Sequence, residues 1–234
     1  HVVAHYSEHD VSGTVSVRDI TAHVHTSDNR KVGIGAFPIA IDPTPFLVDV
    51  DKAEVRSELG NPEQIILGVD RLDYTKGILQ RLQALEELHK AGMMPPRTVF
   101  LQIATPSRER IDHYRQTRNM VEQAVGRING RFGSLGSQVV LYQHQSFDRE
   151  RLVKLYATAD IMLVTPFKDG MNLVAKEYVA CHGDGSGALV LSEFAGAAEE
   201  LSEAFLCNPF DVESIKQQLL AALSASPAEK QARM

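Results

Sequence analysis

A polar segment that contains one glycine, Asp169–Asn172, stands between an apolar run, Ile161–Val164, and a helix-like pattern, Leu173–Ala180. Where a buried strand turns into a helix, free backbone N–H groups and the positive end of the helix dipole can bind an anion or sugar oxygens. Gly170 lets the backbone approach a ligand closely, and the carboxylate of Asp169 can accept hydrogen bonds from hydroxyl groups. An ordinary solvated loop between a strand and a helix explains the same spacing equally well.

A second polar segment, Asp70–Gly77, also follows an apolar run and holds two cations, Arg71 and Lys76, ahead of a helix pattern. A forked guanidinium, an ammonium group and free helix N–H groups together suit a diphosphate. With no carboxylate pair placed to hold a divalent ion, we expect Arg71 and Lys76 to stabilise a diphosphate without a metal. The alternative is a solvated loop in which Arg71 pairs with Asp70 or Asp73.

Two further charged side chains stand within the reach of a ligand as long as a nucleotide. Glu177 lies about one turn into the helix pattern that begins at Leu173. Arg108 follows the predicted strand Thr98–Ala104, and its guanidinium either faces a second anion or forms a surface ion pair. The residues alone leave both readings of Arg108 open.

The elements that must position these side chains alternate between strands and helices. This alternation predicts an α/β fold, a Rossmann-like parallel sheet with helices on both faces, in which ligands bind beyond the carboxyl ends of the strands. The predicted strands are Ile65–Val69, Thr98–Ala104, Val139–Tyr142, Ile161–Val164 and Ala188–Leu191, and the predicted helices are Glu54–Leu59, Ile78–Lys90, Glu109–Ile128, Arg149–Ala157, Leu173–Ala180 and Val212–Ala225.

The beginning of the chain has a different pattern. Weak alternation of apolar and polar residues, interrupted by a turn cluster at Ser27–Arg30, predicts a β-hairpin whose second strand runs from Val32 to Ile41. The two prolines of Asp42–Pro45 hold the chain extended and disfavour a helix. We therefore predict a boundary between a β-rich segment, residues 1–42, and an α/β domain, residues 43–234.

Composition excludes several classes of function. A net charge of −6 argues against a general nucleic-acid binder, which needs a basic surface. No apolar run approaches the roughly 20 residues that span a bilayer, and no signal-peptide pattern opens the sequence, so we expect a cytoplasmic protein without a membrane partner. Histidines near the start, the carboxylates, and Cys181 and Cys207 lack the spacing of metal ligands. We expect two reduced thiols, no metal and no cofactor.

Four motifs in order resemble the trehalose-6-phosphate synthase family. They are Gly68–Gly77, Gly126–Gly130, Thr165–Ala180 and Leu191–Ala198. The resemblance extends from about Gly33 to Pro209, whereas the first thirty or so residues match poorly.

This resemblance implies a retaining glycosyltransferase with the GT-B architecture, in which two Rossmann-like domains face each other. Such enzymes transfer glucose from a nucleotide-diphosphate-glucose donor, most often UDP-glucose, to glucose 6-phosphate, giving trehalose 6-phosphate without a required metal. Because family members are about twice as long, the chain corresponds to the C-terminal donor-binding half, and residues 1–42 to a remnant of the N-terminal acceptor-side domain. The missing domain is then its partner, and the chain alone should bind donor without transferring glucose.

The resemblance also implies roles for individual residues. Arg71 and Lys76 would be catalytic, because they bind the donor diphosphate, and Arg108 would face the acceptor phosphate. Asp169 would bind the hydroxyls of the donor glucose, Glu177 the ribose, and the backbone at Phe147 the base. The remaining implied donor-binding positions are Gly170, Met171, Asn172, Leu173, Val174, Ala175 and Lys176.

Alternatives remain at this point. A relative with another acceptor, such as glucosylglycerol-phosphate synthase or a pseudo-glycosyltransferase that joins cyclitols, would share these motifs. A non-catalytic regulatory homologue should have lost charged positions, yet Arg71, Lys76, Asp169 and Glu177 are all present. The sequence leaves the donor base open among UDP, GDP and ADP, and it is compatible with a homo-oligomer.

Overall fold

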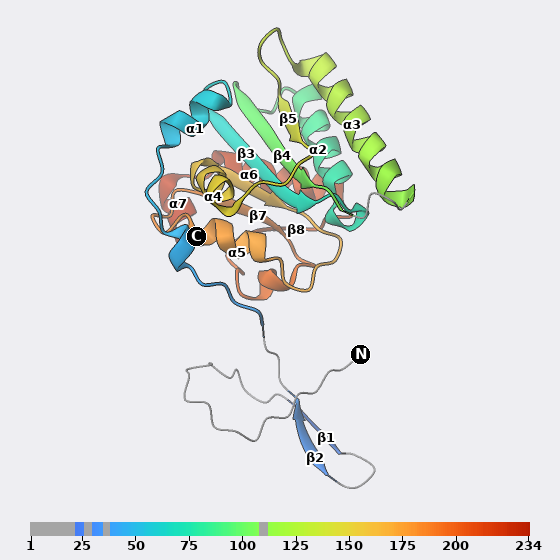
Figure 1. Cartoon of the computed structure of the whole chain (residues 1–234), viewed down its shortest axis with the longest axis vertical. Helices are drawn as coiled ribbons and strands as arrows, with labels where there is room; N and C mark the ends of the chain where they lie inside the picture. The colour runs from blue at the N-terminus through green and yellow to red at the C-terminus, as the bar shows by residue number, and fades with distance from the viewer. Residues whose placement is uncertain (1–21, 26–29, 35–37, 108–111) are drawn as a thin grey trace. The chain divides into compact units, whose positions relative to one another are not determined.

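The computed structural model describes residues 22–25, 30–34, 38–107 and 112–234 (Figure 1). The chain divides into two compact units, His1–Ala40 and Ile41–Met234. This division falls close to the boundary expected after residue 42. The assignment of the first unit to an acceptor-side domain stays a prediction.

The described part of the first unit is a β-hairpin. Strand β1, Ala22–His25, pairs antiparallel with β2, Lys31–Ile34, so that His25 lies opposite Lys31. The hairpin was expected, but residues 38–41 are not part of a strand, so the predicted extension of the second strand to Ile41 is wrong. Pro38 explains this because it has no N–H group to donate to a strand ladder.

The second unit contains a parallel sheet of six strands, which confirms the predicted Rossmann-like fold. The sheet order is β5-β4-β3-β6-β7-β8. The chain builds outward from β3 to β5 and then returns to place β6 beside β3, so the winding direction reverses between β3 and β6. The strand bounds are Gln64–Arg71 for β3, Thr98–Thr105 for β4, Val140–Gln143 for β5, Ile161–Val164 for β6, Ala188–Ser192 for β7 and Phe205–Cys207 for β8.

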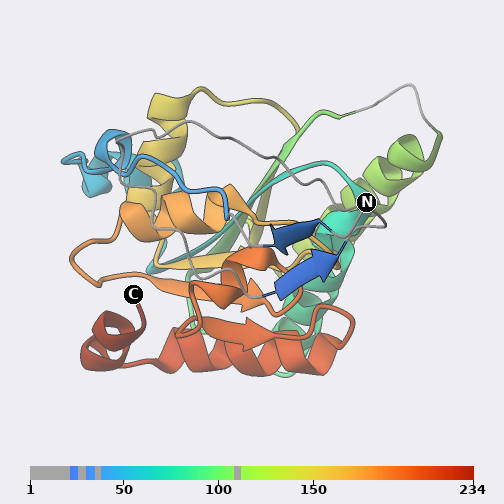
Figure 2. The ribbon, with the colours of Figure 1, turned by 90° about the horizontal axis from the view of Figure 1, so that it is seen from below.

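Helices cover both faces of this sheet. Helices α1, α4 and α5 pack on one apolar cluster, and α2, α3 and α6 pack on the other. Figure 2 shows the sheet between the orange α5 and the red α6. The α-helices are α1 Lys52–Glu58, α2 Ile78–Lys90, α3 Asp112–Phe132, α4 Arg149–Thr158, α5 Leu173–Ala180, α6 Val212–Ser224 and α7 Pro227–Arg233, and the short 3₁₀ helices are η1 Thr44–Phe46, η2 Tyr74–Lys76 and η3 Gly196–Glu199.

Alternate residues of the central strand explain the two clusters. Ile65 and Leu67 of β3 face one cluster and Ile66 faces the other, and all three side chains are buried. A strand buried on both faces reads as a continuous apolar run, which is why the sequence predicted it. Because the strands are parallel, the polar residues that follow them lie at one edge of the sheet, the edge of the strands' carboxyl ends.

The sequence did not predict strand β8, helix α7 or the three short 3₁₀ helices. Strand β8 has three residues, too few for a visible alternation, and it lies at the sheet edge, where it pairs with β7. Helix α7 buries none of its residues and begins at a capping Ser226, so it lacks the apolar stripe that marks a packed helix.

The described residues agree with the expectations for thiols. Cys181 and Cys207 are both free, and burial raises the pKa of the Cys207 thiol to about 12. No helix within the described ranges is long and apolar enough to cross a bilayer.

Candidate functional site

Lys76 and Asp169 meet at the carboxyl edge of the sheet, where the winding direction reverses. Lys76 ends η2 in the loop after β3, and Asp169 lies in the loop after the neighbouring strand β6. The Nζ atom of Lys76 lies 2.6 Å from Oδ2 of Asp169. The two side chains are only 13% and 18% exposed, respectively. The fold thus brings together the two polar segments singled out in the sequence, at the edge where α/β sheets bind ligands.

The Asp169 carboxylate has several donors around it. Besides Lys76, the N–H of Met171 lies 3.3 Å from Oδ1, and the Asn172 side-chain amide lies 3.2 Å from Oδ2. Burial raises the pKa of the Asp169 carboxyl, but the hydrogen bond and charge of Lys76 and the two further donors outweigh it, so the net pKa is below its ordinary value. Asp169 is therefore an ionised acceptor at neutral pH.

The N-terminus of α5 begins beside this carboxylate. Asn172 adopts a left-handed backbone conformation (φ 76°) and caps the helix by accepting the N–H of Ala175 at 3.0 Å. The first N–H groups of a helix have no partner within it. Those of Leu173 and Val174 make no hydrogen bond with any residue in the described ranges. They offer an anion two donors at the positive end of the helix dipole.

The loops after β3 and β6 are locked together. The N–H of Phe167 donates to the carbonyl of Thr75 at 2.8 Å. Gly77 has φ 66°, and a Cβ atom there would lie 2.2 Å from the carbonyl oxygen of Thr165. Only glycine permits this close approach, so the loop that ends in Lys76 lies directly against the loop that leads to Asp169.

The loop after β7 supports Asp169 from the other side. The N–H of Asp169 donates to the carbonyl of Phe194 at 3.2 Å, and the N–H of Gly196 donates to the carbonyl of Asp169 at 3.0 Å. A Cβ atom at Gly196 would lie 2.2 Å from the carbonyl oxygen of Gly170. Small residues after β7 thus let the two loops approach closely.

The model for glycosyltransferase family 20 matches residues 4–234. The chain belongs to glycosyltransferase family 20. Because the match includes most of the first thirty residues, the expectation that they depart from the family is wrong.

Relatives of known function and structure are similar to this family-20 chain over half their length. A trehalose-6-phosphate synthase of Mycobacterium avium is 51% identical over 230 residues, which cover 95% of the chain and 46% of that protein. A structure from E. coli bound with UDP-2-fluoro glucose has a TM-score of 0.80 and 39% identity, covering 91% of the chain and 50% of that protein. A UDP-forming alpha,alpha-trehalose-phosphate synthase from Burkholderia xenovorans in complex with glucose-6-phosphate has a TM-score of 0.80 and 39% identity, covering 88% and 47%. The chain therefore spans about half the length of the relatives it matches.

Within this family-20 chain, Arg71 is an exposed cation at the end of β3. Its guanidinium makes no ion pair or hydrogen bond with any residue that the structure describes. The alternative pairing with Asp70 or Asp73 is wrong, because Asp70 is paired with Arg81 and Asp73 accepts hydrogen bonds from Thr75. Burial raises the pKa of Asp73, yet these bonds, with Tyr114 and the charge of Arg71, bring its net pKa below the ordinary value.

Glu177, Phe147 and Lys176 lie around α4 and α5. Glu177 is half-buried and accepts a hydrogen bond from the Tyr156 hydroxyl at 3.2 Å. Burial, followed by the charge of Glu177, raises the pKa of Tyr156, so this hydroxyl remains a donor. Phe147 packs against the apolar cluster on the α4 and α5 face. Lys176 pairs with Glu200 at 2.8 Å.

The remaining predicted positions differ in what they can offer a ligand. Gly170 is exposed and has open space where a side chain would begin, so its backbone is accessible. The side chain of Ala175 is fully buried and its N–H is taken by Asn172, so no direct contact of either group with a ligand is available. Arg108 lies outside the described residues. The ligand roles of all these positions stay predictions.

Sequence reasoning missed Arg81, which lies in α2 beneath the two loops with a fully buried side chain. The sequence contained a signal for this residue, because the helical spacing puts Arg81 on the same apolar face as Ile78, Leu82, Leu85 and Leu88. A charged residue on such a face needs a buried partner.

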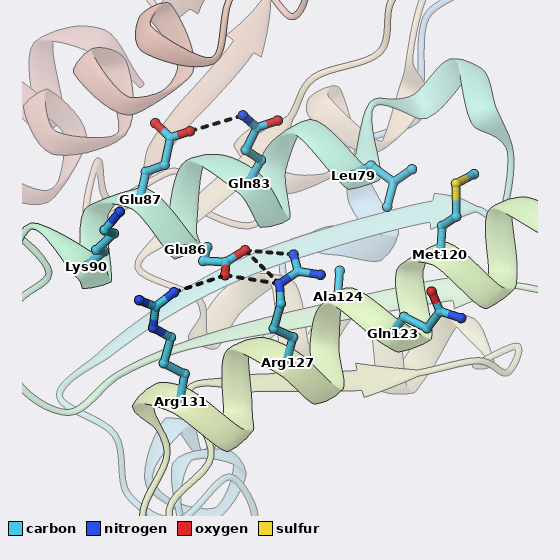
Figure 3. Close-up of a pocket in the computed structure, with 10 residues that line it drawn as sticks. All are labelled: Leu79, Gln83, Glu86, Glu87, Lys90, Met120, Gln123, Ala124, Arg127 and Arg131. Carbon is cyan, nitrogen blue, oxygen red and sulfur yellow. Dashed lines mark hydrogen bonds and ion pairs between the residues drawn. The ribbon is translucent and has the colours of Figure 1, made fainter.

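A cavity of about 540 Å³ lies elsewhere, between α2 and α3 (Figure 3). There Glu86 pairs with Arg127 at 2.7 Å and with Arg131 at 3.9 Å. None of the predicted site residues lines this cavity. The described part of the chain also holds no cluster of three or more His, Cys, Asp or Glu suited to a metal ion.

Proposed function

We propose that the complete protein transfers glucose from UDP-glucose to glucose 6-phosphate, with retention of configuration, to give trehalose 6-phosphate. This chain supplies the donor-binding half, and the other half of the protein, to which residues 1–42 belong, supplies the acceptor side. The observation that carries the proposal is the meeting of Lys76, Asp169 and the N-terminus of α5 at the edge where the sheet reverses direction.

The chemistry of these groups matches the two ends of a nucleotide sugar. Lys76, Arg71 and the free N–H groups of Leu173 and Val174 present positive charge and hydrogen-bond donors to a diphosphate. Asp169 is ionised and accepts hydrogen bonds, as the hydroxyls of a bound glucose require. Two similar structures support this substrate pair. The E. coli structure is bound with UDP-2-fluoro glucose, and the Burkholderia xenovorans structure is in complex with glucose-6-phosphate.

Charge stabilisation is the catalytic contribution of this half. As the bond between glucose and the diphosphate breaks, negative charge grows on the leaving diphosphate. Lys76 and the α5 dipole are held in place before that moment, so they reorganise little during the reaction, and the exposed Arg71 adds a second positive charge. The acceptor oxygen approaches the face of the sugar from which the diphosphate leaves, which retains the configuration.

An activity assay on the complete protein tests the proposal. UDP-, ADP- and GDP-glucose are each offered with glucose 6-phosphate or glycerol 3-phosphate, and products are identified by NMR of the anomeric protons. We expect transfer from UDP-glucose to glucose 6-phosphate, and none by the 234-residue chain alone. Absence of transfer by the complete protein, or transfer only to glycerol 3-phosphate, would contradict the proposed reaction.

A further inference from the structure

The guanidinium of Arg81 contacts both loops that carry the candidate donor site. Its Nη2 atom donates to the carbonyl oxygen of Lys76 at 2.8 Å, and its Nε atom donates to the Thr165 hydroxyl at 2.7 Å. Thr165 is the first residue after β6, at the start of the loop that leads to Asp169. One planar group therefore touches the backbone of the Lys76 loop and a side chain of the Asp169 loop.

A buried network of polar side chains, formed by Asp70 and Gln102, fixes the same guanidinium. Its two Nη atoms donate to the two carboxylate oxygens of Asp70 at 2.5 and 3.1 Å, and Nη1 also donates to Gln102 at 3.1 Å. Gln102 in turn donates to Asp70 at 3.1 Å. These three side chains are at most 7% exposed, so the charge of Arg81 is neutralised within the protein. The paired, forked geometry fixes the plane of the guanidinium and the direction of its remaining N–H groups.

The backbone beneath the network leaves room for it. A Cβ atom at Gly68 would lie 2.6 Å from Oε1 of Gln102 and 2.9 Å from Nη1 of Arg81. A larger residue in this position of β3 would displace the guanidinium. The absence of a side chain at Gly68 is therefore needed for the network to form.

We propose that Arg81 is a positioning residue for the donor site, whose buried guanidinium sets the register between the Lys76 loop and the Asp169 loop. This inference rests on the proposed function, because the register matters only if one ligand contacts both loops. UDP needs only the groups that hold the diphosphate, which are Arg71, Lys76 and the first N–H groups of α5, and it has no sugar to reach Asp169. UDP-glucose needs the diphosphate side and the sugar side at a fixed separation.

A purely structural role would leave a different signature. Buried ion pairs are weak contributors to stability compared with an apolar core, and the Asp70 pair would supply whatever stability Arg81 provides. The hydrogen bonds from Arg81 to the Lys76 carbonyl and the Thr165 hydroxyl, by contrast, hold the two loops. A variant that removes only one loop bond and keeps the Asp70 pair therefore separates positioning from stability.

Thr165→Val is that variant, because it removes the hydroxyl that accepts from Arg81 and nearly preserves the side-chain volume. Thr165→Ser keeps the hydroxyl and should rescue the wild-type behaviour. Arg127→Gln removes an Arg–Glu pair in the cavity of Figure 3, away from both loops, and serves as the matched control. Arg81→Lys keeps the positive charge but loses the forked guanidinium that contacts both loops. It is the second variant if T165V does not fold.

Two readouts are made on the 234-residue chain. The first is the Asp169 carboxyl titration without ligand, followed by carbon NMR. We expect its pKa to rise in T165V, because Lys76 and Asp169 move apart. The second is the affinity for UDP-glucose relative to UDP, which should fall about tenfold, the size of one hydrogen bond to a charged group.

The outcomes distinguish the two proposals. An unchanged Asp169 titration and affinity ratio in T165V, or in R81K should T165V fail to fold, would overturn the positioning role, as would T165S behaving like T165V. Equal losses for UDP and UDP-glucose would also overturn it. If the wild-type chain binds neither compound, the proposed function fails, and the ligand-free titration still decides whether Arg81 sets the loop register.

Discussion

Replacement of Lys76 by Met tests the central ion pair of the site. The substitution removes the ammonium 2.6 Å from Asp169 and leaves a carboxylate that is 18% exposed without its cationic partner. Met171 and Asn172 still donate to this carboxylate, so it stays partly stabilised. The variant should therefore fold, with lower stability and weaker binding of a diphosphate.

The size of both effects follows from one charge-assisted hydrogen bond. Such a bond contributes about 1.5–3 kcal/mol, and the partial exposure of this pair favours the lower end. A loss of about 1.5 kcal/mol in a chain of this size lowers Tm by about 3–6 °C. The affinity for UDP should fall about tenfold or more, because tenfold corresponds to about 1.4 kcal/mol.

The stability effect should depend on pH in a defined direction. The folded pKa of Asp169 is lowered, so its ion pair stabilises the fold at pH values above the ordinary aspartate pKa of about 4. That contribution is lost as the pH falls through the lowered folded value. The Tm difference between wild type and K76M should thus be present at pH 7 and shrink in acid.

Differential scanning calorimetry at several pH values and UDP titrations measure these effects, with Lys90→Met as the control. Lys90 is an exposed lysine at the other end of α2. Equal Tm and equal UDP affinity for K76M and wild type at pH 7 would refute the reasoning. A Tm difference that grows in acid would refute the assigned ion pair.

Two further substitutions test the loop that carries the cations. Arg71→Ala should lower turnover of the complete protein about 10²-fold with Tm nearly unchanged, because Arg71 is exposed and unpaired among the described residues; near-normal turnover would refute its role. Gly77→Ala should destabilise the fold more than Gly92→Ala, because both glycines have φ 66° but only a Cβ at Gly77 would clash, 2.2 Å from the Thr165 carbonyl oxygen. Equal unfolding free energies for the two variants, measured in urea, would show that the clash is relieved without cost.

The arrangement of the loops was predictable from the sequence for a physical reason. Short apolar runs buried on both faces identify parallel strands, and parallel strands place all their following residues at one edge. The observed β6 and α5 have the predicted bounds, so the segment holding Asp169 was located without coordinates. Strands β3 and β6 are neighbours in the sheet, and this places Lys76, which follows β3, beside Asp169, which follows β6.

The partners of charged groups were less predictable. Sequence proximity suggested Asp70 as a partner of Arg71, whereas the pleat of β3 turns Asp70 inward to the buried Arg81 and leaves Arg71 exposed. Adjacent residues of a strand face opposite sides, so neighbours in the sequence are poor candidates for an ion pair. The Arg81 network depends on contacts among three separate elements, which no local pattern encodes.

Calorimetric titration of UDP-glucose into the 234-residue chain, with the Lys76→Met chain in parallel, tests the donor site most directly. We predict saturable binding to one site in the wild-type chain and at least about tenfold weaker binding in the variant. Absence of binding to the wild-type chain, or equal affinity for both chains, would contradict the assignment of this edge of the sheet as a donor site.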